Sequence, residues 1–320
     1  MKTYLDCIPC FFRQALEGAR ITQASPRQQK WIIDEFAKKI PKISLEASPP
    51  EIARFGYALL KRISPNGDPY KDIKQKSNRI ALRLLGKLKN KVSHSQDRLL
   101  AALELAIAGN IIDFGVKNNL NVKAELKKIL AQEHSSVHPA LSDKNMKKKR
   151  KGGVHKRSIF HYSEFRRALK RAKNILYLAD NAGEVVFDRV LVEEIKKVYP
   201  DKNIYYAVKA KPIINDALFE DAKACGIDKT AWVISNGTDA PGTILTLCSK
   251  KFKRIYKSAD LVISKGQGNF ESLSNEKRPI FFLFMVKCPV VAKETSSKLG
   301  DIVLFYNLKR NGTLRNKKIS

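Results

Sequence analysis

Polar residues suited to binding a divalent cation follow two apolar segments in the second half of the chain. Asp180 and Asn181 come directly after the apolar run 174–179, and Asp216 follows the run 203–208 after a short interval. Carboxylate and amide oxygens are the ligands that hard divalent cations prefer. We therefore expect these three residues to hold a metal ion. Taken alone, the Asp-Asn-x-Gly pattern is also typical of an ordinary turn and helix cap.

Residues suited to binding phosphate follow two further apolar runs, 259–264 and 280–285. Lysine would meet a phosphate as a point charge, and glycine would let backbone N–H groups approach an anion closely. The helix expected to begin near residue 183 would aim its positive end at the same place. The joint position of these groups after successive strands favours a site over separate turns. The candidates are Lys265, Gly266, Gly268, Asn269 and Lys287.

The segments that must position these residues alternate between short apolar runs and helical patterns. The runs at 174–179, 203–208, 232–234, 259–264 and 280–285 predict strands, and 301–305 predicts an edge strand. Helices are expected at 183–197, at 216–224 and from Pro241 onward. This order predicts an α/β fold with a mostly parallel, Rossmann-like sheet and helices on both faces. In such sheets ligands bind beyond the carboxyl ends of the strands.

The chain divides into three regions by its patterning. Residues 1–133 predict an all-helical subdomain, because 51–63 and 97–108 place apolar residues three and four apart. Residues 134–158 are basic and nearly free of large apolar side chains, which indicates a flexible insertion. Residues 159–320 form the predicted α/β metal- and phosphate-binding domain.

Composition limits the classes of function. The 320 residues carry 61 basic and 31 acidic side chains, so the net charge is +30. Such a charge attracts polyanions, and a basic nucleic-acid-binding protein is the alternative to an enzyme that acts on phosphorylated metabolites. No run is long and apolar enough for a membrane helix or a secretory signal, so we expect a cytoplasmic protein. The oligomeric state is not predicted.

The five cysteines do not suggest a disulfide framework, because they are sparse and odd in number. Cys7 and Cys10 form a CxxC pair near the start of the chain. Such a pair is either structural, as part of a packed helix start, or a redox or metal pair. No second CxxC follows, which disfavours a structural zinc site with four ligands.

Several longer motifs resemble the damage-control phosphatase family, which was formerly catalogued as a domain of unknown function. They are LADNAGEVVFD (178–188), KPIINDA (211–217), KGQGNFESL (265–273) and KCPVVA (287–292). CIPCFFRQAL (7–16) and AGNIIDFG (108–115) resemble the prokaryotic, single-domain branch of the family. The resemblance covers residues from about 4 to about 306.

The resemblance implies metal-dependent hydrolysis of phosphate esters, with sugar phosphates or damaged phosphometabolites as substrates and Mg²⁺, Mn²⁺, Co²⁺ or Ni²⁺ as cofactor. It assigns the metal to Asp180, Asn181 and Asp216, and substrate phosphate to 265–269 and Lys287. It further suggests that Asn110 and Asp113 close over the substrate and that Glu184 supports the metal ligands. Because some members have been called carboxyl methyltransferases, that activity is a further alternative, although the glycine-rich cofactor loop it needs is missing after residue 179.

Overall fold

The computed structural model describes residues 1–64, 67–110 and 157–309. The helices are α1 (Cys7–Ile21), α2 (Pro26–Lys39), η1 (Ile40–Lys42), α3 (Pro49–Ile63), α4 (Lys71–Ser93), α5 (Arg98–Ala108), α8 (Tyr162–Arg171), α9 (Glu184–Val198), α10 (Phe219–Ala224), η2 (Ile227–Lys229), α11 (Lys250–Ser258), α12 (Gln267–Leu273), α13 (Pro289–Glu294) and η3 (Asn307–Lys309). The strands are β1 (Arg157–Phe160), β2 (Asn174–Leu178), β3 (Asn203–Val208), β4 (Trp232–Ser235), β5 (Leu261–Lys265), β6 (Ile280–Met285) and β7 (Ile302–Tyr306).

The strands form one sheet in the order β1-β7-β6-β5-β2-β3-β4. Strands β2 to β6 are parallel, β7 is antiparallel to β6, and β1 is parallel to β7. The mostly parallel α/β sheet expected from the sequence is therefore confirmed. After β2 the chain proceeds outward through β3 and β4, then returns to place β5 on the other side of β2. This reversal makes the carboxyl end of β2 a topological switch point, where open α/β sheets bind ligands.

Two local expectations were wrong. The strand at 301–305 is not an edge strand, since β7 lies between β6 and β1, and β1 begins inside the predicted insertion 134–158. The helix expected from Pro241 is absent, because this stretch forms turns packed against α12, where the Gly242 backbone meets Gly268 too closely for a side chain. The helix begins at Lys250, where the Ser249 side chain accepts the N–H of Phe252 as an N-cap.

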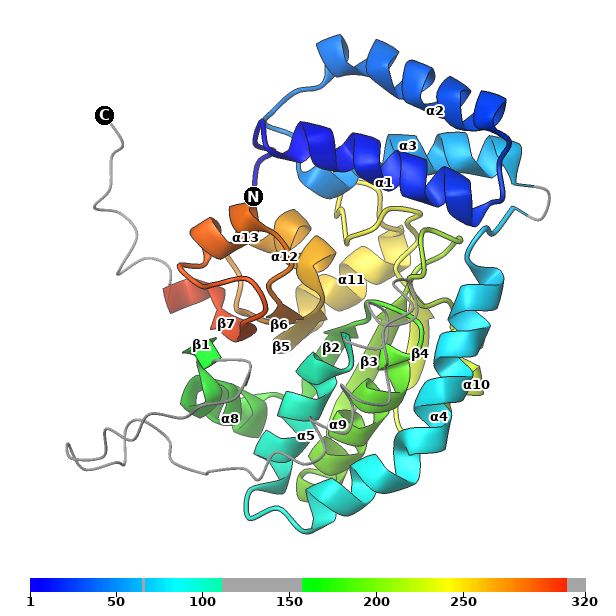
Figure 1. Ribbon diagram of the computed structural model, residues 1–320. Coiled ribbons are helices and arrows are strands. Elements are labelled where there is room, and N and C mark those ends of the chain that lie inside the picture. Colours follow the sequence, from blue (N-terminus) through cyan, green and yellow to red (C-terminus); the bar gives the residue numbers. More distant parts are fainter. Residues whose placement is uncertain (65–66, 111–156, 310–320) are drawn as a thin grey trace, which may run out of the picture.

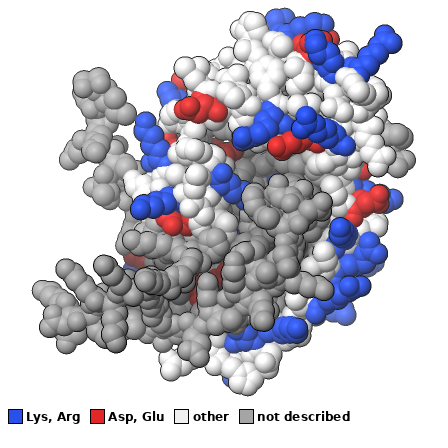
Figure 2. Space-filling view, viewed as in Figure 1, with Lys and Arg blue, Asp and Glu red and all other residues white. Residues whose placement is uncertain are grey.

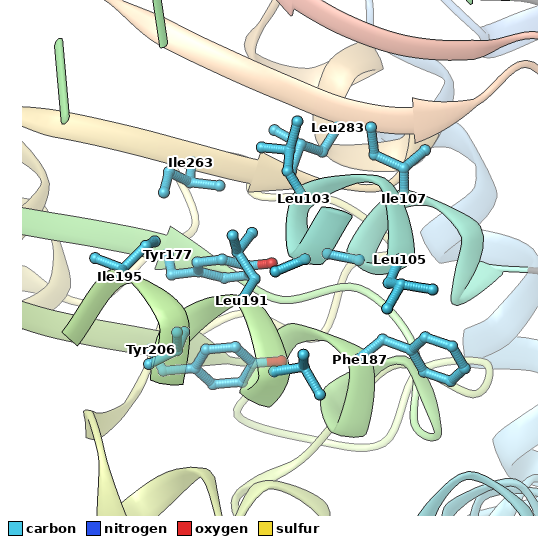
Figure 3. Close-up of a cluster of buried hydrophobic side chains, with 14 of the residues drawn as sticks. Leu103, Leu105, Ile107, Tyr177, Phe187, Leu191, Ile195, Tyr206, Ile263 and Leu283 are labelled. Carbon is cyan, nitrogen blue, oxygen red and sulfur yellow. The ribbon is translucent and has the colours of Figure 1, made fainter. Parts of the chain in front are cut away.

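Helices cover both faces of the sheet (Figure 1). On one face α4, α5, α8 and α9 pack in a core that includes Tyr177 and Tyr206, while Leu176 and Leu178 point into the core formed with α11, α12 and α13 on the other face. This alternation follows the two-residue period of a strand. Figure 3 shows α5 beside α9 on this face of the sheet, with Leu103 near Leu283 on β6. The nearly complete burial of α5 explains its largely apolar sequence, which only Glu104 interrupts after Arg98.

The helices before residue 110 divide into two groups. Helices α1, α2 and α3 form a separate apolar cluster that includes Phe11, Phe36 and Leu60. Helices α4 and α5 instead belong to the core of the sheet, where both pack on α9. Figure 1 shows α1–α3 as a layer beyond the sheet, on the side of α12 and α13. The domain boundary expected at residue 133 lies outside the described residues.

Basic side chains line one helix of the described surface. Figure 2 shows Lys and Arg along the right edge of this face, where Figure 1 places α4. Their exposed members on α4 are Lys71, Lys76, Arg79, Arg83 and Lys87. The basic region 134–158 lies outside the described residues up to residue 156. In the described ranges, no helix combines the length and apolar character needed to cross a membrane.

Candidate active site

A short backbone ladder brings the three expected metal ligands together. Asn181 pairs with Asp216 in an isolated antiparallel bridge. On either side, the Ala217 N–H donates to the Asp180 carbonyl at 2.8 Å, and the Ala182 N–H donates to the Asn215 carbonyl at 2.9 Å. The loops after β2 and β3 are therefore joined directly at the switch point. Next to them Ile214 has φ of 42°, a left-handed backbone that costs a β-branched residue energy and is common at functional sites.

The carboxylate of Asp180 lies against the backbone of Gly266, at the end of the neighbouring strand β5. A Cβ atom at Gly266 would be 2.0 Å from Asp180 Oδ2, and the φ of Gly266 is 80°. Both the space and the backbone conformation therefore require glycine. The first glycine of the predicted phosphate loop thus makes room for the candidate metal ligand.

Replacing Gly266 with alanine is expected to displace the Asp180 carboxylate and to destabilise the protein by about 1–3 kcal/mol, because the new Cβ overlaps Asp180 and the backbone is left-handed. Gly86→Ala is the matched control: Gly86 lies in α4 with no atom within 4 Å of the added Cβ, so stability should rise by about 0.5–1 kcal/mol. Denaturant unfolding of both variants measures the difference. Equal stability of the two variants would contradict this assignment.

Glu184, in the first turn of α9, orients the candidate metal ligands through hydrogen bonds. Its Oε1 accepts the side-chain N–H groups of Asn110 at 2.6 Å and of Asn181 at 2.8 Å. Asn181 also donates to Asp180 Oδ2 at 3.0 Å. Because the side-chain Nδ2 of Asn181 is committed to two carboxylates, its side-chain Oδ1 is the atom left to bind a cation. Asn110 therefore supports the carboxylates, and Asp113 lies outside the described residues.

Lys265 has a different position from the one expected. Its side chain is 1% exposed, and Nζ donates to Asp188 Oδ1 at 2.6 Å and lies 3.2 Å from Glu184 Oε2. Burial lowers the pKa of Lys265, but the charges of Asp188 and Glu184 outweigh it and hold the pKa above its ordinary value. The ammonium group is committed to two buried carboxylates and does not line the cavity described below. Its positive charge therefore offsets the charges of Asp188 and Glu184, and the ammonium group is not placed to contact a phosphate in the cavity.

Asn269 likewise holds the loops together. Its Nδ2 donates to the carbonyls of Ala179 and Lys265, and its Oδ1 accepts the hydroxyl of Thr243. All of the side-chain groups of Asn269 are thereby engaged within the protein. Gly183, the N-cap of α9, donates its N–H to Asn78 Oδ1 at 2.7 Å, so this helix-terminal donor is also committed. Of the predicted phosphate loop 265–269, Gln267 and Gly268 line the cavity.

Among the described residues, the buried carboxyl groups around the candidate metal ligands outnumber the buried lysines that pair with them. Four carboxyl groups gather there, from Asp180, Glu184, Asp188 and Asp216. The buried cations that pair with them are Lys265 and Lys209, whose Nζ lies 3.4 Å from Asp216 Oδ2. Among the residues that the structure describes, the formal excess of two negative charges fits a divalent cation.

The acidity of these groups reflects the same excess of negative charge. Burial raises the pKa of Asp180 well above its usual range, and Glu184 and Asp216 raise it further, against Lys287 and Lys265. Burial likewise raises the pKa of Glu184, which Lys265 and Lys287 partly offset. A cation bound at the cluster would therefore compete with protons for these carboxylates.

The ligand residues open into a cavity of about 520 Å³ between the sheet and α1–α3. Asp180, Asn181 and Asp216 line its floor, and Arg13 on α1 and the exposed Lys287 also line it. Lys287 is thus the predicted phosphate lysine that the structure places at the cavity. The volume and the mixture of polar and apolar lining residues suit a small metabolite.

The CxxC pair lies in the first turn of α1 and lines the same cavity. Cys7, Cys10 and Cys288 are free thiols there, and burial raises the pKa of Cys7 and of Cys288.

Within the described residues, no three or more His, Cys, Asp or Glu side chains form a group that could hold a metal ion. The candidate cation site is not such a group, because one of its three ligands is the amide of Asn181.

Sequence reasoning missed the groups that act through packing. Lys209 and Asp188 complete the charged cluster, and Glu271 lies on α12 beside the cavity. Lys209 directly follows β3, so the rule of polar strand ends could have found it. Asp188 and Glu271 lie inside the motifs 178–188 and 265–273, one turn or more into a helix, where spacing alone does not distinguish a site residue from a solvated one.

The fold and site define an open α/β protein with an acidic small-molecule site at the switch point of its sheet. The family model of the Damage-control phosphatase ARMT1-like domain matches residues 3–303, and the chain belongs to the damage-control phosphatase family.

Relatives over most of the chain agree with this family. An uncharacterized protein of Methanocaldococcus jannaschii is 37% identical over 313 residues, with 93% of each chain covered. A damage-control phosphatase of Pyrococcus horikoshii is 34% identical, with 96% of this chain and 99% of the relative covered. The crystal structure of a DUF89 family protein from P. horikoshii matches with a TM-score of 0.80 and 31% identity, covering 96% of this chain and 99% of that chain. The recognition of the family from its motifs is therefore confirmed.

Proposed function

We propose that this protein is a metal-dependent phosphatase that hydrolyses phosphate esters of small metabolites, such as sugar phosphates or damaged phosphometabolites. The observation that supports the metal dependence is the buried excess of carboxylates at the switch point, where, within the described ranges, four acidic groups meet two lysines. Membership of the family supports the phosphatase activity.

The ligand residues would have separate roles. Asp180, Asn181 and Asp216 would hold Mg²⁺, Mn²⁺, Co²⁺ or Ni²⁺ through two carboxylates and one amide oxygen. A cation held there would supply positive charge to offset the charge of the phosphoryl group as it is transferred to water. Glu184 and Asn110 keep the carboxylate and amide groups in orientation through their hydrogen bonds.

The cavity residues would hold the substrate. Lys287 projects a positive charge close enough to lower the pKa of Asp180, so a phosphate bound between this lysine and the cation would be neutralised from two sides. Arg13 and Gln14, which α1 places on the other side of the cavity, would contact the organic part of the ester.

A panel of sugar phosphates, incubated with each of the four cations in turn, tests the function. We expect phosphate release that requires added cation and is abolished by a chelator. Phosphate release that proceeds at the same rate with and without chelator would contradict metal dependence.

Cation binding is also expected to stabilise the folded protein more at high pH than at low pH. Because the pKa of Asp180 is raised in the folded state, the folded protein binds more protons than the unfolded protein. The free energy of unfolding therefore decreases as the pH rises above the pKa that Asp180 has in the unfolded state. A cation replaces those protons, so its contribution grows with pH. The rise in melting temperature on adding Mn²⁺ should therefore be larger at about pH 8 than at about pH 5.5.

A pair of variants controls this measurement. Asp216→Asn should remove the Mn²⁺ effect at both pH values, because Asp216 is a proposed ligand. Asp239→Asn should keep the effect, because Asp239 is paired with Arg54 at 2.6 Å and does not line the cavity. An equal rise at both pH values in the unmodified protein would refute the coupling.

A further inference from the structure

Glu271 is a carboxyl group of the cavity that the proposed metal site does not use. It lies on α12 and lines the cavity together with Asp180 and Asp216. Gln267 donates to Glu271 Oε1 at 2.8 Å and accepts the backbone N–H of Lys287 at 3.0 Å through its own Oε1. One side-chain amide therefore fixes Glu271 relative to the lysine that we assign to the phosphate.

The surroundings of Glu271 keep it partly protonated near neutral pH. Burial raises the pKa of Glu271 to about 7, while the hydrogen bond from Gln267 and the ammonium group of Met1 lower it. In the part of the chain that the structure describes, the thiols of Cys7 and Cys288 also lie close enough to Glu271 for its charge to raise their pKa. A group that titrates near the operating pH can both donate and accept a proton efficiently.

Hydrolysis of an alkyl phosphate needs such a group. When the bond between phosphorus and the ester oxygen breaks, the electron pair stays on that oxygen, which is a poor leaving group until it gains a proton. Among the described carboxyl groups of the cavity, Asp180 and Asp216 are committed to the cation in our proposal, and Asp6 is exposed at the rim. Glu271 is the carboxyl group that remains.

We propose that Glu271 is the general acid that gives a proton to the ester oxygen of the leaving alcohol. Water forms the new bond to phosphorus as the ester bond breaks, and the proton of Glu271 moves to the departing oxygen. The attacking water, on the opposite side of phosphorus, releases a proton to the solvent, and the Glu271 carboxylate regains one from the solvent, so that protons and charge balance over the cycle. This role rests on the proposed phosphatase function and assigns its proton donor.

The comparison of two esters tests the proposal. A sugar phosphate has an alcohol leaving group that needs a proton, whereas p-nitrophenyl phosphate releases an acidic phenol that departs without one. In Glu271→Gln, which keeps the size of the side chain, kcat should fall about 100- to 1,000-fold on the sugar phosphate. On the aryl ester the loss should be at least about tenfold smaller. Equal losses on both esters, or no loss on the sugar phosphate, would overturn the role of Glu271.

Two further measurements separate the possible causes. Glu276→Gln removes a carboxyl group just after α12 that does not line the cavity, and both esters should keep their rates. In the unmodified protein, the ratio of sugar phosphate to aryl rates should fall as pH rises through about 7, because Glu271 loses its proton. A constant ratio overturns the proposal even if Glu271→Gln does not fold. Failure of the unmodified protein to hydrolyse either ester with any of the four cations overturns the phosphatase function itself.

Discussion

Asp180→Asn is expected to abolish cation-dependent phosphate release while making the cation-free protein more stable. Activity should fall by at least about 100-fold, because a charged ligand of the proposed cation is lost while the shape of the side chain is kept. Stability should rise, because burial and the nearby carboxylates of Glu184 and Asp216 already oppose the charge of Asp180. A neutral amide avoids that repulsion.

The gain in stability should be about 1 kcal/mol, which is typical when a strained active-site group is replaced. Chemical denaturation without cation measures it, and phosphate release with cation measures the loss of activity. The same variant should also lose the rise in melting temperature caused by Mn²⁺. A variant that is both active and less stable would show that Asp180 is a structural residue and not a ligand.

Lys265→Met is expected to destabilise the protein by about 3–5 kcal/mol, because it leaves Asp188 and Glu184 buried without their counter-charge. Asp188 would keep the hydroxyl groups of Tyr177 and Tyr206, at 2.7 and 2.8 Å, but these carry no charge. Urea unfolding of the purified variant measures the change.

Lys287→Met is the matched control for this prediction. The side chain of Lys287 is exposed at the cavity, so the free energy of unfolding should change by less than about 0.5 kcal/mol. Its activity on phosphate esters should fall, since a charge assigned to the phosphate is removed. The two lysines were indistinguishable in the sequence, and opposite patterns of stability and activity would separate them. Equal stability of both variants would disprove the structural role of Lys265.

The strand ends explain why much of the site could be predicted. Asp180 and Gly266 follow the carboxyl ends of β2 and β5, which are neighbours in the sheet. The rule that ligands bind beyond these strand ends places the two residues together. Asp216 was found by the same rule, although the bridge that pairs it with Asn181 could not be foreseen. The helix expected from Pro241 failed because tertiary packing against α12 overrode local propensity.

The sequence by itself determined strands β2 to β7, helices α9 and α10, the family, and the set of polar residues at one rim of the sheet. These follow from local patterns, which extend over a few residues. The tertiary structure alone decided which of those residues face the cavity and which are buried with a counter-charge. Lys265 is bound to Glu184 across 81 positions of the chain, and Asn110 to the same carboxylate across 74. Asp180 and Asn181, first noted as a polar pair after a strand, owe their charge environment to these distant partners, because a buried charge is set by what packs around it.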